Sequence, residues 1–195
     1  ELRYGLGLQM LLYLFTLKEE GRAIFGGQEI VPAGVLYTPA REPMLRCARD
    51  TAPEKIEKAR KKELRRSGMV LEDPAVLQAM EHSALTSPCY LPIAVKKGGA
   101  VTGSLASAEQ LGKLSKYVDR LLHEITQEVF AGNIDADPYA RTPQQSACTY
   151  CEFASACHFE NGCGSDRMEY IKATKNDEFW QHIDEVNGKE ARSDG

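Results

Sequence analysis

Near its start the chain reads Leu6-Gly7-Leu8-Gln9-Met10-Leu11-Leu12-Tyr13-Leu14. This stretch opens a run rich in Leu and Met with no breaker between Gly7 and Gly21, and it predicts a helix over residues 6–20. The helix is apolar on nearly every face, so we expect neighbouring elements to bury it on most sides. Gln9 and Tyr13 lie four residues apart and therefore share one face. Taken alone, the pair is typical of a core glutamine satisfied by backbone groups beside an ordinary packing tyrosine.

A second informative stretch lies near the other end of the chain, where Cys148, Cys151 and Cys157 follow the spacing C-x2-C-x5-C. Thiolates at this spacing bind iron–sulfur clusters or zinc, and spacing alone does not choose between them. A complete site needs a fourth ligand, for which Cys163 and His158 are the local candidates. Four of the six cysteines fall within sixteen residues, which favours a metal site over a disulfide framework.

The rest of the chain alternates expected helices and short strands, which predicts an α/β fold. The clearest helix covers residues 107–131, where Ser107 and Gln110 form a capping box and Gly132 follows the last turn. We divide the chain into residues 1–146, a cysteine-rich segment at 147–170 and a polar tail at 171–195. The other expected elements are a strand at 34–38, helices at 52–67, 74–82 and 177–186, a hairpin pairing 91–95 with 100–102, and a loop at 133–145.

Charge is distributed unevenly along the chain. The formal net charge is −4, but residues 1–70 are net positive and the remainder is net negative, so we expect any DNA contact in the first third. The helix at 52–67 carries a candidate phosphate-binding set, namely Lys58, Lys61, Lys62 and Arg65. The more ordinary interpretation is a solvated helix with ion pairs four residues apart, such as Glu54–Lys58 and Glu57–Lys61.

These features together resemble a known family. The helix with Gln9 and Tyr13 resembles the Q-x3-Y helix of RecB-type nucleases in the PD-(D/E)XK superfamily, which has a restriction-endonuclease-like fold. The cysteine spacing resembles the C-terminal half of the iron–sulfur staple in the subclass of those nucleases that carries a cluster. Residues 32–37, 43–44, 132–134 and 138–139 resemble the AddB (RexB) family, the B subunits of ATP-dependent helicase–nucleases. The resemblance implies the C-terminal portion of a nuclease fold, followed by a cysteine-rich knot.

The resemblance also implies roles for individual residues. Gln9 and Tyr13 would support the active site and the DNA strand. Cys148, Cys151 and Cys157 would bind a [4Fe–4S] cluster whose fourth ligand lies upstream, with Cys163 as the local alternative. The family's acids for Mg²⁺ and its catalytic Lys precede the Q-x3-Y helix. The sequence begins at Glu1, so we expect a piece of a longer enzyme that does not cut DNA by itself.

The function implied is that of a DNA exonuclease subunit in double-strand break repair and recombination. Its expected partners are DNA and an AddA-type helicase–nuclease subunit. Two alternatives stay open: a non-catalytic interaction module that binds zinc or an iron–sulfur cluster, and an iron–sulfur nuclease of the CRISPR-adaptation type. The longest apolar run, residues 10–17, is too short to cross a bilayer, and no signal peptide is visible. We therefore expect a cytoplasmic protein with no membrane partner.

Overall fold

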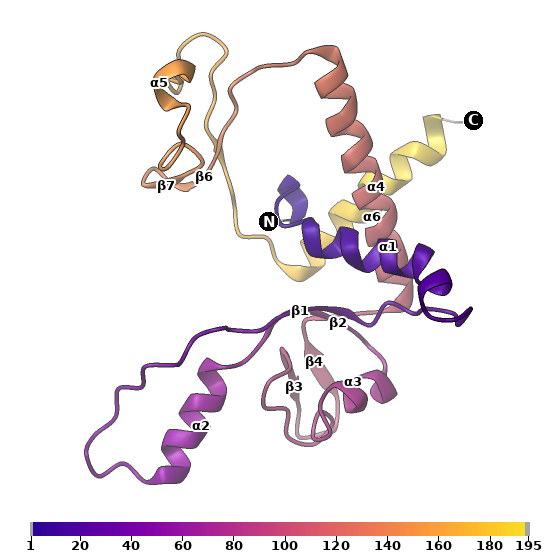
Figure 1. Cartoon of the computed structure of the whole chain (residues 1–195), viewed down its shortest axis with the longest axis vertical. Helices are drawn as coiled ribbons and strands as arrows, with labels where there is room; N and C mark the ends of the chain where they lie inside the picture. Colours follow the sequence, from indigo (N-terminus) through magenta and orange to yellow (C-terminus); the bar gives the residue numbers. More distant parts are fainter. Residues whose placement is uncertain (1, 194–195) are drawn as a thin grey trace. The chain divides into compact units, whose positions relative to one another are not determined.

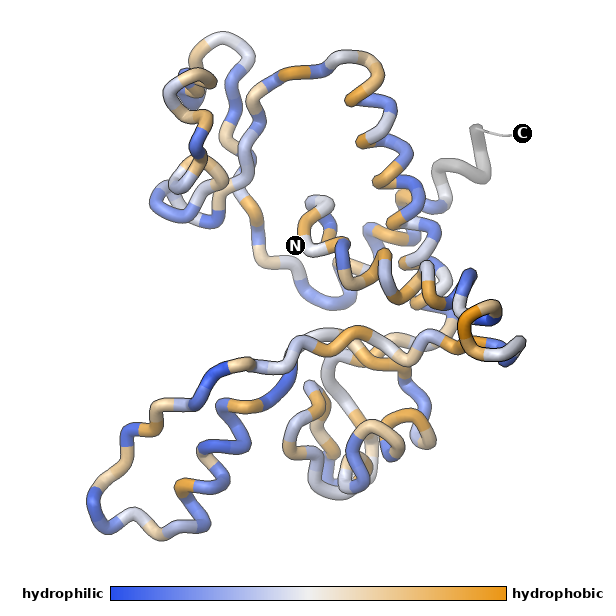
Figure 2. Tube along the Cα trace, viewed as in Figure 1, coloured by the Kyte–Doolittle hydropathy of each residue, from blue (hydrophilic) through white to orange (hydrophobic). Residues whose placement is uncertain are grey.

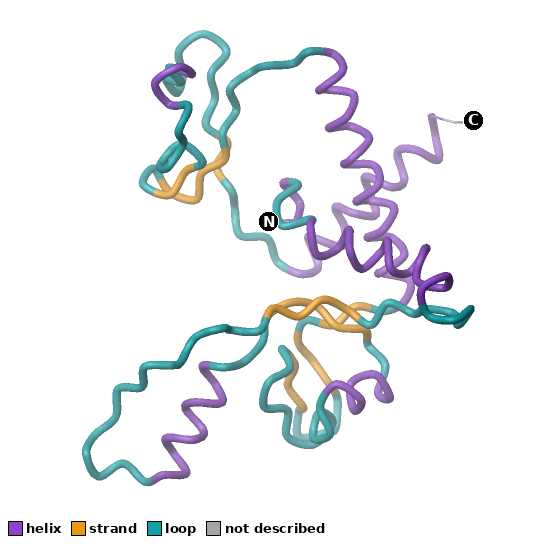
Figure 3. Tube along the Cα trace, viewed as in Figure 1, coloured by secondary structure: helices purple, strands orange, loops and turns teal. Residues whose placement is uncertain are grey.

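The backbone forms two compact units. The computed structural model describes residues 2–193 of the chain. One unit spans residues 9–115, and the other combines residues 2–8 with residues 116–193. Both units contain helices and short strands, which confirms the predicted α/β class (Figure 1 and Figure 3). The three-part division made from sequence, at residues 146 and 170, stays a prediction.

The 9–115 unit contains most of the strands. Its elements are α1 (Gln9–Ile24), β1 (Gly34–Tyr37), α2 (Pro53–Glu63), β2 (Ser67–Leu71), α3 (Pro74–Met80), β3 (Ile93–Val95), β4 (Val101–Gly103), β5 (Leu105–Ala106) and the first turns of α4 (Ala108–Ala131). β1 and the β3–β4 hairpin lie where the sequence predicts them, and so do α3 and α4. The strands β2 and β5 were not predicted.

β2 is the central strand of a three-stranded sheet with the order β1-β2-β5. It pairs antiparallel with β1, where Leu36 lies opposite Gly68, and parallel with β5, where Val70 lies opposite Leu105. Gly68 has a φ of 129°, and a Cβ atom there would collide with the carbonyl oxygen of Val35. Glycine therefore permits the close approach of the two strands at this position.

The helix predicted over residues 52–67 is too long. α2 ends at Glu63, and Ser67 already begins β2, so Gly68 lies inside a strand instead of ending a helix. The helix ends early because of contacts with distant parts of the chain. The backbone of this stretch pairs with β1 and β5, which are distant in sequence, and a pairing of this kind overrides local helix propensity.

α1 packs against β1, as the sequence predicts for the first helix and the first strand. α1 begins three residues later than predicted and continues through Gly21 instead of stopping there. Leu11 and Phe15 are buried, whereas Tyr13 is 54% exposed and Leu17 is 44% exposed. The expectation that most faces of this helix are buried is therefore wrong for the described residues, because the sheet covers one side of the helix.

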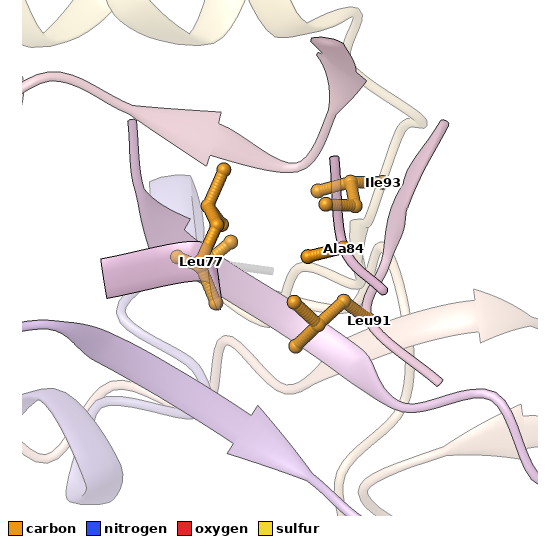
Figure 4. Packing of buried hydrophobic residues seen from close by; sticks show 5 residues of the cluster. Leu77, Ala84, Leu91 and Ile93 are labelled. Carbon is orange, nitrogen blue, oxygen red and sulfur yellow. The ribbon is translucent and has the colours of Figure 1, made fainter. Parts of the chain in front are cut away.

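The core of the 9–115 unit lies beside α3 and the β3–β4 hairpin. Leu77, Ala84, Leu91 and Ile93 lie together there, each at most 2% exposed, and Val70 from β2 completes the cluster (Figure 4). Each fully buried aliphatic side chain of the size of leucine stabilises a fold by about 1.5–3 kcal/mol. This cluster therefore ties the hairpin and α3 to the sheet.

α4 begins at the predicted capping box. The Ser107 hydroxyl accepts a hydrogen bond from the Gln110 amide at 3.1 Å, and the Gln110 side-chain oxygen accepts one from the Ser107 amide at 2.9 Å. The two bonds satisfy backbone donors that the first helical turn leaves free. Along the predicted apolar stripe, Leu114 and Val118 are fully buried, but Val129 near the other end is 70% exposed.

The second unit contains small elements at both ends of the remaining chain. They are η1 (Leu2–Tyr4), the rest of α4, β6 (Tyr139–Thr142), β7 (Gln145–Ser146), α5 (Ala154–Cys157), β8 (Glu169–Tyr170) and α6 (Asn176–Ser193). The strands form a sheet with the order β7-β6-β8, so the prediction of a loop throughout residues 133–145 is wrong. α6 covers the predicted helix at 177–186 and is longer at both ends.

Polarity sets α2 apart from the helices that build the cores. None of its residues is buried, and Figure 2 shows it as hydrophilic along most of its length. A helix of this kind faces solvent or a polar ligand. Across the part of the chain that the structure describes, no helix has both the length and the apolar character needed to span a membrane.

Candidate functional site

Gln9 and Tyr13 form the pair that the sequence singles out. They lie one turn apart at the start of α1, and the Gln9 side-chain amide donates a hydrogen bond to the Tyr13 hydroxyl at 2.9 Å. Both residues are exposed. The interpretation of a buried glutamine satisfied by backbone is therefore wrong, and the pair presents polar groups at the surface. The accessory catalytic role of both residues stays a prediction.

The candidate phosphate-binding residues come together in one groove, which we call the α2 groove. Its volume is about 810 Å³, and the loop at 87–89 forms its other wall. The basic side chains that line it are Lys55, Lys58, Lys61, Lys62 and Arg65. The groove also contains the carboxylates of Glu54 and Glu57, so its positive charge is partly balanced.

Two of these basic residues have partners within the chain. Lys61 forms the expected ion pair with Glu57 at 3.7 Å, while the pair expected between Glu54 and Lys58 does not form among the described residues. Such exposed pairs contribute little stability. Arg65 donates one hydrogen bond to the Leu91 carbonyl at 2.9 Å and another to the Ile93 carbonyl. Its guanidinium therefore holds the strand next to the groove, and contact with DNA through this set stays a prediction.

Glu81 fixes the opposite wall of the α2 groove, and sequence reasoning missed it. Its carboxylate accepts hydrogen bonds from the amides of Cys89 at 2.6 Å, Leu91 at 2.9 Å and Tyr90 at 3.1 Å. Burial raises the pKa of the Glu81 carboxyl, but the bonds from Cys89, Leu91 and Tyr90 outweigh burial and leave the pKa below its ordinary value. The sequence offers one weak signal for this role: Glu81 directly follows a short helix and precedes a loop.

The predicted ligand cysteines lie between β7 and β8, in what we call the cysteine segment, residues 147–170. Cys148 is half-buried, and Cys151, Cys157 and Cys163 are exposed; all four are free thiols. The Cys151 amide donates to the Cys148 carbonyl at 3.2 Å, which closes a turn between the first two thiols. Cys157 ends α5, and His158 follows with a left-handed backbone, at a φ of 52°.

The four thiols do not converge on one point. Within residues 2–193, no three Cys, His, Asp or Glu side chains lie close enough together to hold a metal ion. As the structure places them, these side chains do not form a complete site for an iron–sulfur cluster or for Mg²⁺. The ligand roles of Cys148, Cys151 and Cys157, and of Cys163 as a fourth ligand, stay predictions.

Comparison with known proteins decides the family. A model of the PD-(D/E)XK nuclease superfamily matches residues 1–158. The chain belongs to this superfamily. The superfamily assignment agrees with the mixed α/β architecture.

Similar proteins are named as the B subunit of an ATP-dependent helicase/deoxyribonuclease. The protein from Ruminiclostridium cellulolyticum is 29% identical over 96% of this chain, and that from Thermoanaerobacter sp. strain X514 is 31% identical over 98%. The protein from Acetivibrio thermocellus is 34% identical over 91% of the chain. The chain spans only 15–16% of the length of these relatives.

Proposed function

We propose that this chain is the C-terminal part of the nuclease domain of a B subunit in an ATP-dependent helicase–nuclease. The observation that carries the proposal is similarity along 91–98% of the chain to three proteins named as that subunit. The enzyme would degrade DNA at double-strand breaks ahead of recombination. It would work in the cytoplasm, with an AddA-type partner subunit and Mg²⁺.

The residues of this chain would position DNA instead of cleaving it. The α2 groove presents lysine ammonium groups on a helix that has no buried residue, so phosphates can approach them without displacing the core. The Gln9–Tyr13 pair presents an amide and a hydroxyl at the surface, next to one another. Metal-dependent hydrolysis of a phosphodiester needs carboxylates that hold the metal ion. No such group exists among residues 2–193, so we expect the chain alone to be inactive.

A second candidate is a non-catalytic interaction module. It is favoured by the same observation, that the described residues bring no three acidic, cysteine or histidine side chains together. The two candidates differ in what the gene encodes before Glu1. Sequencing that region tests the proposal: strands carrying two acids and a Lys directly upstream support the nuclease domain. An open reading frame that encodes no such residues there would contradict it and favour the module.

A further inference from the structure

The apolar stripe of α4 continues beyond the part of the helix that is buried. Its side chains recur every three or four residues and so share one face, namely Leu111, Leu114, Val118, Leu121, Ile125 and Val129. Leu114 and Val118 are fully buried, but Ile125 is 49% exposed and Val129 is 70% exposed. Figure 2 shows hydrophobic residues recurring along the whole helix. The last turns of α4 therefore present an apolar face that the described residues leave largely uncovered.

A groove of about 520 Å³ lies at this end of the helix, and we call it the α4 groove. Its apolar lining consists of Leu121, Ile125 and Val129. Its polar lining contains one amide and four carboxylates, and no basic side chain among the described residues: Asn133, Glu124, Glu128, Asp135 and Asp137. Glu124 is paired with Arg120 at 2.8 Å, so the other three carboxylates supply most of the negative charge. The groove therefore combines apolar side chains with negative charge.

The backbone at the end of the groove is held by hydrogen bonds. The Asn133 amide donates to the Glu128 carbonyl at 3.1 Å, and the Asn133 side chain donates to the Glu128 carboxylate at 2.6 Å. The Asp135 amide donates to the Asn133 side-chain oxygen at 2.9 Å. α4 has no basic residue in its last turn, so the negative end of the helix dipole adds to the charge of the carboxylates. This end of the groove therefore favours a cationic group.

The lining of the α4 groove defines the chemistry of its occupant. The carboxylates repel nucleic acid, and no three of them lie close enough together to hold a metal ion within residues 2–193. An apolar stripe with a spacing of three and four residues is the surface against which a second helix packs. Lysine or arginine side chains beside the stripe of that second helix would meet the carboxylates of the groove. The surface is therefore complementary to an amphipathic helix with basic flanks.

We propose that the α4 groove binds a basic amphipathic helix from the rest of the longer subunit. The inference rests on the proposed function in one respect, which is that this chain is part of that subunit. The chain spans only 15–16% of the length of its relatives, so most of each relative lies outside the matched segment. A segment of the same polypeptide also meets the groove at a higher effective concentration than a separate protein does. A helix of the partner subunit, or a second copy of this chain, would be a different occupant.

The test is photocrosslinking in the full-length protein from the source gene, purified with its partner subunit. The photoreactive residue p-benzoylphenylalanine replaces Val129 or Ile125 in the groove, and it replaces Val31 as the matched control, because Val31 is 63% exposed and lies in the other unit. Val129 and Ile125 should capture one peptide from outside the 195 residues, with apolar residues three or four apart and Lys or Arg beside them. The two captured positions should lie about 3–4 residues apart, because the two helices run side by side. Val31 should not capture this peptide.

Reversal and rescue of one charge test the complementarity. Asp135→Lys should lower the crosslinking yield at Val129 by about threefold or more, because repulsion replaces attraction in the groove. Replacing one Lys or Arg of the captured helix with Glu should restore the yield. The matched control is Glu20→Lys, the same charge reversal at an exposed position of α1 outside the groove, and it should leave the yield unchanged.

Several results would overturn the inference. Val129 could capture only the partner subunit, only a second copy or only residues 1–195, or it could capture no more than Val31 does. A captured peptide without basic residues, or an equal effect of Asp135→Lys and Glu20→Lys, would also contradict it. DNA degradation by the same complex separates this inference from the proposed function. A complex that degrades DNA but gives one of these results contradicts the inference alone, whereas a complex that captures the basic helix and leaves DNA intact contradicts only the proposed function.

Discussion

The Leu91 amide donates a 2.9 Å hydrogen bond to the carboxylate of Glu81, ten residues earlier in the chain. Cys89 and Tyr90 donate to the same carboxylate, so one side chain holds the loop that forms a wall of the α2 groove. Leu91 belongs to the buried cluster of the 9–115 unit. The wall of the groove and the core beneath it are therefore joined through a single titratable group.

Replacing Glu81 with Gln should lower the free energy of unfolding by about 1 kcal/mol at neutral pH, after allowance for solvent screening. The folded state lowers the pKa of Glu81, so its contribution is present above the ordinary value of 4.5. The contribution is lost as the pH falls from that value through the lower pKa of the folded state. Urea unfolding of the wild-type chain and of the Glu81→Gln variant between pH 3 and pH 7 measures this contribution. The two free energies of unfolding should converge at the acidic end. A stability difference between the two proteins that does not change with pH would contradict the role given to the Glu81 carboxylate.

Two glycines should respond to alanine in opposite directions. Gly68 has a positive φ and lies against the carbonyl of Val35, so Gly68→Ala should destabilise the 9–115 unit by about 2 kcal/mol or more. Gly112 lies inside α4, where an added methyl group would meet open space, so Gly112→Ala should add about 0.5–1 kcal/mol. Thermal unfolding followed by circular dichroism checks both. Equal tolerance of the two substitutions would contradict the strand pairing at Gly68.

Elements with local signals could be predicted from the sequence, and elements made by distant pairing could not. α4 was predictable because Ser107 and Gln110 form their capping box within one turn. β2 was missed because it exists only through partners elsewhere in the chain, the strands β1 and β5. Gly68 looks like a helix stop in sequence, and only the approach of β1 shows why a glycine lies there.

The candidate site follows the same rule. The lysines of the α2 groove lie on one helix, so their clustering could be predicted from spacing. Arg3, Arg141 and Lys172 are far apart in sequence, and nothing local indicates that they line one groove. Glu81 was missed because a carboxylate that accepts backbone amides has no sequence pattern of its own.

The cysteine assignment predicts iron in the longer protein. A version that includes the upstream nuclease residues, purified without oxygen, should contain iron and sulfide, and Cys157→Ala should remove both. Cys47→Ala is the control, because that exposed cysteine lies outside the cysteine segment. If Cys163→Ala also removes the iron while every upstream cysteine is dispensable, the fourth ligand is local and the distant-ligand prediction is wrong.

The central claim is that this chain is part of a DNA-degrading enzyme. Its most direct test is ATP- and Mg²⁺-dependent degradation of linear duplex DNA by the full-length protein from the source gene, purified with its partner subunit. We expect degradation by that complex, about 10- to 100-fold less by its Gln9→Ala variant, since a positioning contact is lost, and none by the 195-residue chain alone. Full activity in the Gln9→Ala complex would contradict the role of the Gln9–Tyr13 pair. A complex that leaves DNA intact would contradict the claim itself.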